Sequence, residues 1–344
     1  AAVIAWFGHW PGGLAVATIL SCGVFAAISG SSVATAATIG TVAIPEMINR
    51  GYNKKFVYGL LAAGGTLGIL IPPSIPMIIY GFVTEESVIS LFLAGIGPGI
   101  ALLLFFIVFS MIYARMGGQE REAKQGWPER KRATLRALPA VVLAVLIISG
   151  IYSGAFTPTE AAAAACVYAI VVETLVFRRL RFSQLFRLSQ GSSITIATLL
   201  ILIAAGSTMT WFMTLERVPA TLAAIMSDVP NVVVLLAINV MVLLIGMFID
   251  PNSAVIVISP LIAPAAMAVG VDGIHLGASI VFNLAIGMIT PPFGLNIFIG
   301  MSTFRIGYGE VVRNVLPFIG IAMLALLLVT YIPALVMWLP ELVR

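Results

Sequence analysis

The chain has 344 residues, of which 60% are hydrophobic and only 9% charged, and its mean hydropathy is +1.11. This composition excludes an ordinary soluble domain and indicates a polytopic membrane protein. The net charge of +4 does not indicate nucleic-acid binding, because the basic residues fall in short loops between apolar runs, where they report orientation in a membrane.

The apolar runs are long enough for helices rather than the short alternating strands of a membrane barrel, so the predicted fold class is all-α. The chain opens with "AAVIAWFGHWPGG" and no Met, and we interpret it as lacking the N-terminal part of a longer protein. The sequence divides into three predicted parts: a first repeat over 1–115 (hairpin 14–47, broken helix 56–82, helix 89–114), a basic cytoplasmic connector over 116–136, and a second repeat over 137–344 (helices 138–154, 160–177 and 192–215, hairpin 231–270, broken helix 275–300, last helix 312–338).

Two of these segments are predicted to enter and leave the membrane on the same side. The two arms of 14–47 are about 15 residues each, or roughly 22 Å as helix, which is short for a crossing. If both hairpins are re-entrant, 16 of the 18 basic residues fall on one side, which the positive-inside rule makes cytoplasmic. The stretch 180–188 suits either an interfacial amphipathic helix or an extension of the helix that follows.

The first hairpin has a polar centre, "SGSSVAT", with Ser29, Ser31, Ser32 and Thr35 around Gly30. Hydroxyl side chains in membrane helices often only bridge neighbouring helices. Their concentration around one glycine favours a binding site instead.

A pattern then recurs in the two halves. "GGTLGILIPPSIPMIIYG" (64–81) and "NLAIGMITPPFGLNIFIG" (283–300) each place a Gly four residues before a Pro-Pro pair. A Pro-Pro pair removes two backbone donors and breaks the helix, so each crossing becomes two half-helices with an unwound centre.

The hairpin tips stand at matched distances from these breaks. Ser31 precedes Pro72 by 41 residues, and Asn252, in "FIDPNSA", precedes Pro291 by 39. The charge pattern places the two hairpins on opposite sides of the membrane, so the repeats are predicted to be inverted.

Inverted repeats with broken helices are typical of secondary transporters, whose binding site lies at the midplane between the repeats. Half-helix N-termini suit a carboxylate, and freed carbonyls and hydroxyls suit sodium. Asp250 supplies the one formal charge at the tips. A single carboxylate favours sodium coupling, because proton coupling usually requires several buried acids or histidines. Asp250 could also simply cap a helix. The sequence has no phosphate-binding loop and no metalloprotease motif, so an enzyme is not expected.

These motifs, with "LFLAGIGPGI" and "GMFIDPNSAVIVISPLIAPAAMAVGVD", resemble the large M-type membrane subunit of tripartite ATP-independent periplasmic (TRAP) transporters along essentially the whole chain. The resemblance implies a bacterial inner-membrane subunit that works with a small four-helix membrane subunit and a periplasmic substrate-binding protein. It further implies sodium-driven uptake of an organic acid anion, such as a C4-dicarboxylate or a sialic acid, by an elevator mechanism.

The resemblance also implies two sodium sites and a substrate site between them. The first sodium site would use Ser29, Ser31, Ser32, Gly68, Pro72 and Ser74, and the second Asp250, Asn252, Ser253, Gly287, Thr290 and Pro292. The substrate would contact Ser32, Thr35, Asn252 or Asn296. Because Ile71 stands where the second repeat has Thr290, the two sodium sites are not expected to have identical ligands.

Three alternatives stay open at this point. A self-sufficient sodium-dicarboxylate symporter of similar architecture would need no binding protein. An anion channel would use the broken helices as a filter. An assembly or anchoring subunit would tolerate substitution of Ser31 or Asp250 without loss of transport.

Overall fold

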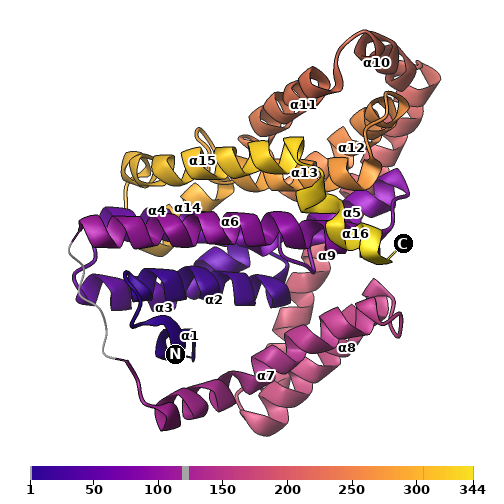
Figure 1. The fold of residues 1–344 in the computed structure, drawn as a ribbon. Helices are drawn as coiled ribbons and strands as arrows, with labels where there is room; N and C mark the ends of the chain where they lie inside the picture. Colours follow the sequence, from indigo (N-terminus) through magenta and orange to yellow (C-terminus); the bar gives the residue numbers. More distant parts are fainter. Residues whose placement is uncertain (1, 118–123, 305, 344) are drawn as a thin grey trace.

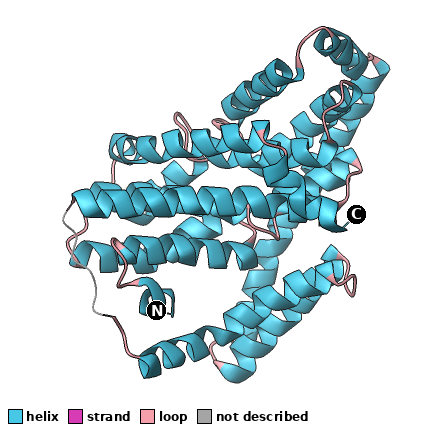
Figure 2. Cartoon of the chain, in the orientation of Figure 1, coloured by secondary structure: helices cyan, strands magenta, loops and turns pink. Residues whose placement is uncertain are grey.

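A computed structural model of the chain describes residues 2–117, 124–304 and 306–343. Those residues form helices joined by loops, with no strand among them, which confirms the predicted all-α fold (Figure 2). The first half contains α1 (Ala2–Phe7), α2 (Gly13–Ser29), α3 (Ser32–Asn49), α4 (Lys54–Thr66), the 3₁₀ turn η1 (Leu67–Ile69), α5 (Ile75–Thr84) and α6 (Val88–Met116).

The second half begins with a group of helices that precedes its hairpin. These are α7 (Trp127–Tyr152), α8 (Pro158–Val171) with the π-helical turn η2 (Val172–Val176), α9 (Phe182–Leu215) and α10 (Val218–Ser227). The repeat proper follows as α11 (Asn231–Gly246), α12 (Pro251–Ala268), α13 (Gly273–Gly287), α14 (Leu295–Phe304), α15 (Tyr308–Tyr331) and α16 (Ala334–Val343).

A constant offset of 219 residues relates the two repeats. It takes Pro72 to Pro291, and both Pro-Pro bonds are cis. It also takes the N-cap of α3, Ser31, to the N-cap of α12, Asp250. The expected match of Ser31 with Asn252 is therefore off by two positions, because a helix cap rather than an amide side chain is the equivalent feature.

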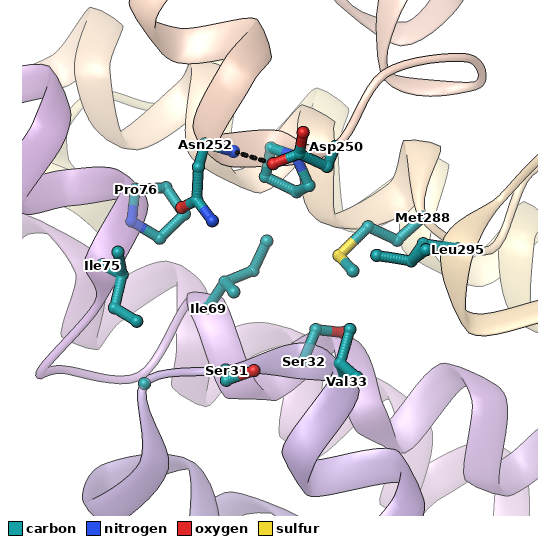
Figure 3. Close-up of a pocket in the computed structure, with 12 residues that line it drawn as sticks. Ser31, Ser32, Val33, Ile69, Ile75, Pro76, Asp250, Asn252, Met288 and Leu295 are labelled. Carbon is teal, nitrogen blue, oxygen red and sulfur yellow. Dashed lines mark hydrogen bonds between the residues drawn. The ribbon is translucent and has the colours of Figure 1, made fainter. Parts of the chain in front are cut away.

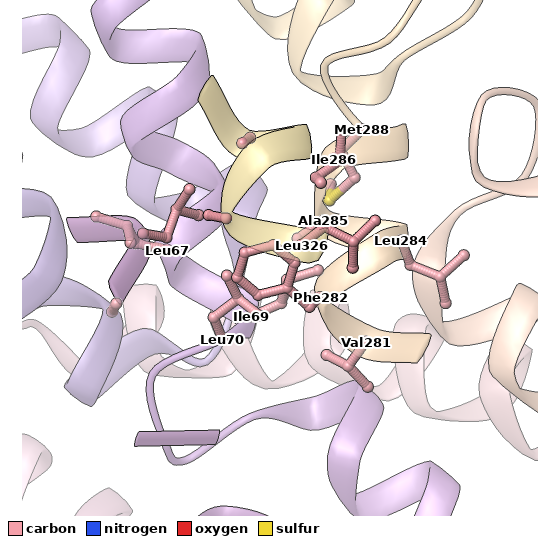
Figure 4. Packing of buried hydrophobic residues seen from close by; sticks show 14 of the residues in the cluster. Leu67, Ile69, Leu70, Val281, Phe282, Leu284, Ala285, Ile286, Met288 and Leu326 are labelled. Atoms are coloured by element: carbon pink, nitrogen blue, oxygen red, sulfur yellow. The ribbon is translucent and has the colours of Figure 1, made fainter. Parts of the chain in front are cut away.

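The two repeats are interlocked rather than side by side. The returning arm of the first hairpin, α3, packs on α14 of the second repeat, and the returning arm of the second, α12, packs on α5 of the first. Likewise α4 packs on α15 and α6 on α13. Buried side chains of η1 and α13 meet at the centre, among them Leu67, Leu70 and Phe282 (Figure 4).

Helices α7 and α8 extend away from this core, with α7 contacting α1, whereas α9 packs on α12 of the second hairpin (Figure 1). Among the described residues, six helices are long and apolar enough to cross a membrane, including Trp127–Tyr152, Pro158–Val176 and Ser183–Leu215. Apolar side chains along these three are largely exposed in the isolated chain. Such surfaces are suited to lipid or to another membrane protein.

Several helix boundaries differ from the sequence-based expectations. Helix α7 starts at Trp127, inside the predicted connector, where Pro128 suits a first turn and the Glu129 carboxylate accepts the Gly126 N–H at 3.1 Å. The expected last helix, 312–338, ends at Tyr331 and resumes at Ala334, since Pro333 cannot continue it.

Helix α10, between α9 and α11, was not expected. The stretch 180–188 was left between two interpretations. From Phe182 on it is continuous with α9, so the extension of the following helix is the correct one.

Candidate functional site

The tip of the first hairpin lies against the Pro-Pro break of its own repeat. Gly30 joins α2 to α3 with φ of 59°, a left-handed conformation that suits glycine. A Cβ on Gly30 would lie 2.6 Å from the Pro73 carbonyl oxygen. Ser31 then caps α3, its hydroxyl accepting the Ala34 N–H at 3.3 Å.

Hydroxyl and carbonyl oxygens gather behind this tip. Thr35 Oγ1 donates to the Ser31 carbonyl at 2.8 Å and lies 3.1 Å from Ser29 Oγ. A Cβ on Gly68 would overlap the Ser31 carbonyl and lie 2.7 Å from Thr35 Oγ1, so only glycine allows the broken helix to approach so closely. The three oxygens form a neutral cluster of the kind that binds a hard cation.

The tip of the second hairpin carries a charge instead of hydroxyls. Asp250 caps α12 by accepting the N–H groups of Asn252 at 3.0 Å and Ser253 at 3.2 Å, and the Ser253 hydroxyl donates to the same carboxylate. Asn252 Oδ1 is buried and has no hydrogen-bond partner among the described residues. A buried acceptor without a protein donor is available to bind a ligand at this tip.

The two tips face one another across a cavity of about 70 Å³ (Figure 3). Ten of its twelve lining residues form five pairs related by the 219-residue offset. The pairs are Ser31 with Asp250, Ser32 with Pro251, Val33 with Asn252, Ile69 with Met288, and Pro76 with Leu295; Gly30 and Ile75 complete the lining. The cavity therefore lies at the pseudo-symmetric centre of the inverted repeats.

Four helices start at this cavity. Their first residues all line it: Ser32 of α3, Ile75 of α5, Pro251 of α12 and Leu295 of α14. Each helix start carries about half a positive charge from aligned peptide dipoles. Among the twelve lining residues none is basic, and Asp250 is the one charged side chain. The positive partial charge at this lining thus comes from the backbone rather than from side chains.

A second cavity, of about 200 Å³, adjoins the first and shares Asp250, Met288 and Leu295 with it. Residues 246–249, where α11 ends, form one wall, and Phe293 and Phe298 form another. The carbonyl groups at a helix C-terminus carry partial negative charge. With the Asp250 carboxylate, this side of the site suits a cation.

Asn296 ties the second repeat to the first tip. Its Nδ2 donates to Ser32 Oγ at 2.8 Å and to the Ala62 carbonyl at 3.0 Å, and the side chain is fully buried. Its Oδ1 has no partner among the described residues. Asn296 therefore packs behind the cavity wall, one residue beyond Leu295.

The predicted site residues divide into four groups by position. Four of them line the 70 Å³ cavity: Ser31, Ser32, Asp250 and Asn252. Three lie in or against the oxygen cluster: Ser29, Thr35 and Gly68. Ser253 donates to Asp250, and Asn296 supports Ser32.

The remaining predicted residues neither line the 70 Å³ cavity nor belong to the oxygen cluster. Ser74 caps α5 and donates to the Ile69 carbonyl at 2.6 Å, and Thr290 Oγ1 donates back to the Ile286 carbonyl at 2.7 Å. Gly287 packs on the Gly246 backbone rather than on the tip. Pro72 and Pro292 lie at the two breaks and outside the cavity lining, and the Pro292 carbonyl accepts the Tyr308 hydroxyl at 2.7 Å.

Sequence reasoning missed the apolar part of the cavity lining. Val33, Ile69, Ile75, Pro76, Met288 and Leu295 are indistinguishable from core residues by type. The 219-residue offset was the signal that could have found most of them, since it pairs Ile69 with Met288 and Pro76 with Leu295 across the two Pro-Pro breaks.

Comparison with known proteins supports the same architecture. Residues 1–335 match the family described as the DctM component of tripartite ATP-independent periplasmic transporters. Among solved structures, the YdaH transporter of Alcanivorax borkumensis superposes with a TM-score of 0.65, covering 96% of this chain and 86% of that one. At 15% sequence identity this likeness shows the fold alone.

Curated relatives are more similar in sequence. The ectoine TRAP transporter large permease protein TeaC of Halomonas elongata is 39% identical over 99% of this chain and 80% of its own length. The C4-dicarboxylate TRAP transporter large permease protein DctM of Pseudomonas aeruginosa is 40% identical over 97% of this chain and 79% of its own length. The isethionate TRAP transporter permease protein DctMQ of Oleidesulfovibrio alaskensis is 37% identical over 96% of this chain, which spans 53% of that protein.

Proposed function

Because the chain belongs to the DctM component family of tripartite ATP-independent periplasmic transporters, we propose that it carries an organic acid anion across the membrane, driven by a sodium gradient. A C4-dicarboxylate, a sialic acid or a similar carboxylate is the proposed substrate class. The observation that carries this proposal is the convergence of four helix N-termini on one cavity between the two hairpin tips.

The anion is proposed to bind where those helices begin. Backbone N–H groups and helix dipoles hold a carboxylate without a basic side chain, as they do at other helix N-termini. A fixed guanidinium or ammonium would bind the anion regardless of the coupling ion. The cavity lining contains no such basic side chain. The Asp250 carboxylate therefore repels the anion until a cation neutralises that carboxylate.

Sodium is proposed to bind at two places of different character. One is the neutral cluster of Ser29, Thr35 and the Ser31 carbonyl beside Gly68. The other is next to Asp250, between the end of α11 and the second break. All the candidate donors are oxygens, which are the ligands of hard cations. We therefore reassign Thr35 from the substrate to the first sodium site.

This arrangement offers a physical reason for coupling. A sodium ion beside Asp250 would cancel the charge that repels the anion, so each ligand would raise the affinity of the other by the same factor. The interlocked hairpins and half-helices would move together as the transported unit, as in an elevator mechanism. The basic loops are proposed to be cytoplasmic, in a bacterial inner membrane.

The proposed partners are a small four-helix membrane subunit, separate or fused as the name DctMQ of one relative suggests, and a periplasmic binding protein that delivers the substrate. The test is uptake of labelled C4-dicarboxylate by proteoliposomes holding the complex. Uptake should need both an inward sodium gradient and the binding protein. Equal uptake without the gradient would refute sodium coupling, and equal uptake without the binding protein would favour a self-sufficient symporter.

A further inference from the structure

A basic pocket lies at the junction of α8 and α9, away from the proposed transport site. This pocket is shallow and open to the surface, has a volume of about 520 Å³ and is lined by Glu173, Arg179, Leu180, Gln184, Arg187 and Leu188. Arg178 and Arg181 flank it in sequence. Within the described part of the chain, none of these four arginines forms an ion pair.

The backbone around this pocket is irregular and well connected. The π-helical turn η2 is followed by its C-cap Phe177, whose N–H donates to the Val172 carbonyl. The carbonyl of Glu173 then accepts the N–H groups of Arg179 at 2.9 Å and Leu180 at 3.3 Å, with Arg178 at φ of 53°. Single π-turns are rare and occur often at functional positions. Here the turn directs the chain so that Arg179 and Arg187 line one pocket.

The pocket also lies where two candidate membrane spans meet. It joins the ends of two candidate spans, Pro158–Val176 and Ser183–Leu215. Leu175, Val176, Phe186 and Leu188 beside it are each at least 60% exposed in the isolated chain. A ligand that fits must therefore pair with guanidinium groups at one end and cover apolar side chains at the other.

We propose that this pocket binds the phosphate of an anionic phospholipid in the cytoplasmic leaflet. Guanidinium groups bind phosphate oxygens with paired hydrogen bonds, and the Gln184 amide adds a further donor. The acyl chains lie along the exposed apolar side chains of η2 and α9. Basic pockets between membrane helices on the cytoplasmic side recognise anionic lipid head groups by this chemistry.

The Glu173 carboxylate lines the same pocket and opposes an anion there. Two arginines in the lining and two adjacent to it outnumber this single acid, so the pocket is net positive. Removing the arginines should weaken anion binding, whereas Glu173→Gln should strengthen it. This substitution removes the repulsive charge and keeps a side chain of similar size.

The test uses the detergent-solubilised full chain and native mass spectrometry to count bound phosphatidylglycerol and phosphatidylcholine with the same acyl chains. Phosphatidylglycerol should bind about tenfold more tightly to the wild type, and Arg179→Gln with Arg187→Gln should remove that preference. Glu173→Gln should strengthen phosphatidylglycerol binding. Inorganic phosphate at millimolar concentration should not displace the lipid, because it lacks the acyl chains.

The matched control is Lys131→Gln with Arg132→Gln, which removes the same charge from exposed positions of α7 outside the pocket. Equal loss of phosphatidylglycerol in both double variants would overturn the proposal in favour of a general surface potential. Equal binding of the two lipids by the wild type would overturn it as well. Displacement by inorganic phosphate would replace the lipid with a soluble phosphate compound as the ligand.

Discussion

Asn296 Nδ2 donates to Ser32 Oγ at 2.8 Å and so joins the second half-helix of one repeat to the hairpin tip of the other. Both side chains are buried, and the same amide group also holds the Ala62 carbonyl in α4. One side chain thus fixes the relative position of three elements around the cavity. Four variants test the assignments made for this region.

Replacement of Asn296 by Ala should destabilise the protein. The substitution leaves the buried Ser32 hydroxyl without its donor, at a cost of about 1–3 kcal/mol, and removes the second donor of the Ala62 carbonyl, which keeps its helical bond within α4. The midpoint of thermal unfolding in detergent should fall accordingly. The control is Ser302→Ala, an exposed position in the same helix whose hydroxyl bonds only the Ile299 carbonyl. Equal midpoints for the two variants would contradict the bridging role.

Replacement of Asp250 by Asn should weaken sodium activation of uptake. Asn still caps a helix, so α12 should start as before, but the carboxylate is lost. The sodium concentration for half-maximal uptake should rise at least about tenfold, since contacts to a charged group contribute about 1.5–3 kcal/mol.

The matched control for that variant is Asp272→Asn. Asp272 caps α13 with the same two-bond geometry, at 2.9 and 3.0 Å, but does not line either cavity at the hairpin tips. Sodium dependence should be unchanged there. An unchanged sodium requirement in Asp250→Asn would remove Asp250 from the ion site.

Replacement of Gly68 by Ala should disrupt the first tip. The added Cβ would lie 2.7 Å from Thr35 Oγ1 and overlap the Ser31 carbonyl, so the oxygen cluster must open. We expect sodium-driven uptake to fall by at least about tenfold, which corresponds to roughly 1.4 kcal/mol. Gly320→Ala in α15, where a Cβ meets nothing within 4 Å, should transport normally. Wild-type uptake by Gly68→Ala would show that the cluster is not used.

Replacement of Thr35 by Val separates the two roles considered for this residue. Val keeps the shape but removes the hydroxyl that bonds the Ser31 carbonyl and contacts Ser29. A role in the sodium site predicts a higher half-saturating sodium concentration with substrate affinity unchanged at saturating sodium. Thr38→Val, at an exposed position of the same helix, is the control. A change confined to substrate affinity would return Thr35 to the substrate site.

The features that the sequence predicted well are set by local backbone chemistry. The breaks at Pro72 and Pro291 follow from missing donors and ring clashes, and Gly30 marks the turn of the first tip because its φ is positive. The all-α fold followed from the length of the apolar runs. Each of these needs only a few consecutive residues to be recognised.

The features that the sequence did not reveal depend on packing between distant segments. Ile69 and Met288 line the cavity but have the composition of a core, so nothing in their type distinguishes them. The position of Thr35 behind the tip depends on the approach of Gly68, more than thirty residues away. The register of the second tip was displaced by two residues because Ser31 was matched with the amide side chain of Asn252, whereas the equivalent helix cap is Asp250.

The crossing of each hairpin arm over the half-helix of the other repeat has a consequence for biosynthesis. The bond between Ser32 and Asn296 joins residues 264 positions apart, so a tip inserted early waits for a segment near the end of the chain. Contacts of such long range form late and slowly. The nascent protein must therefore hold an unpaired, polar hairpin in the bilayer until translation is nearly complete. During this period the chain is most exposed to degradation by membrane proteases.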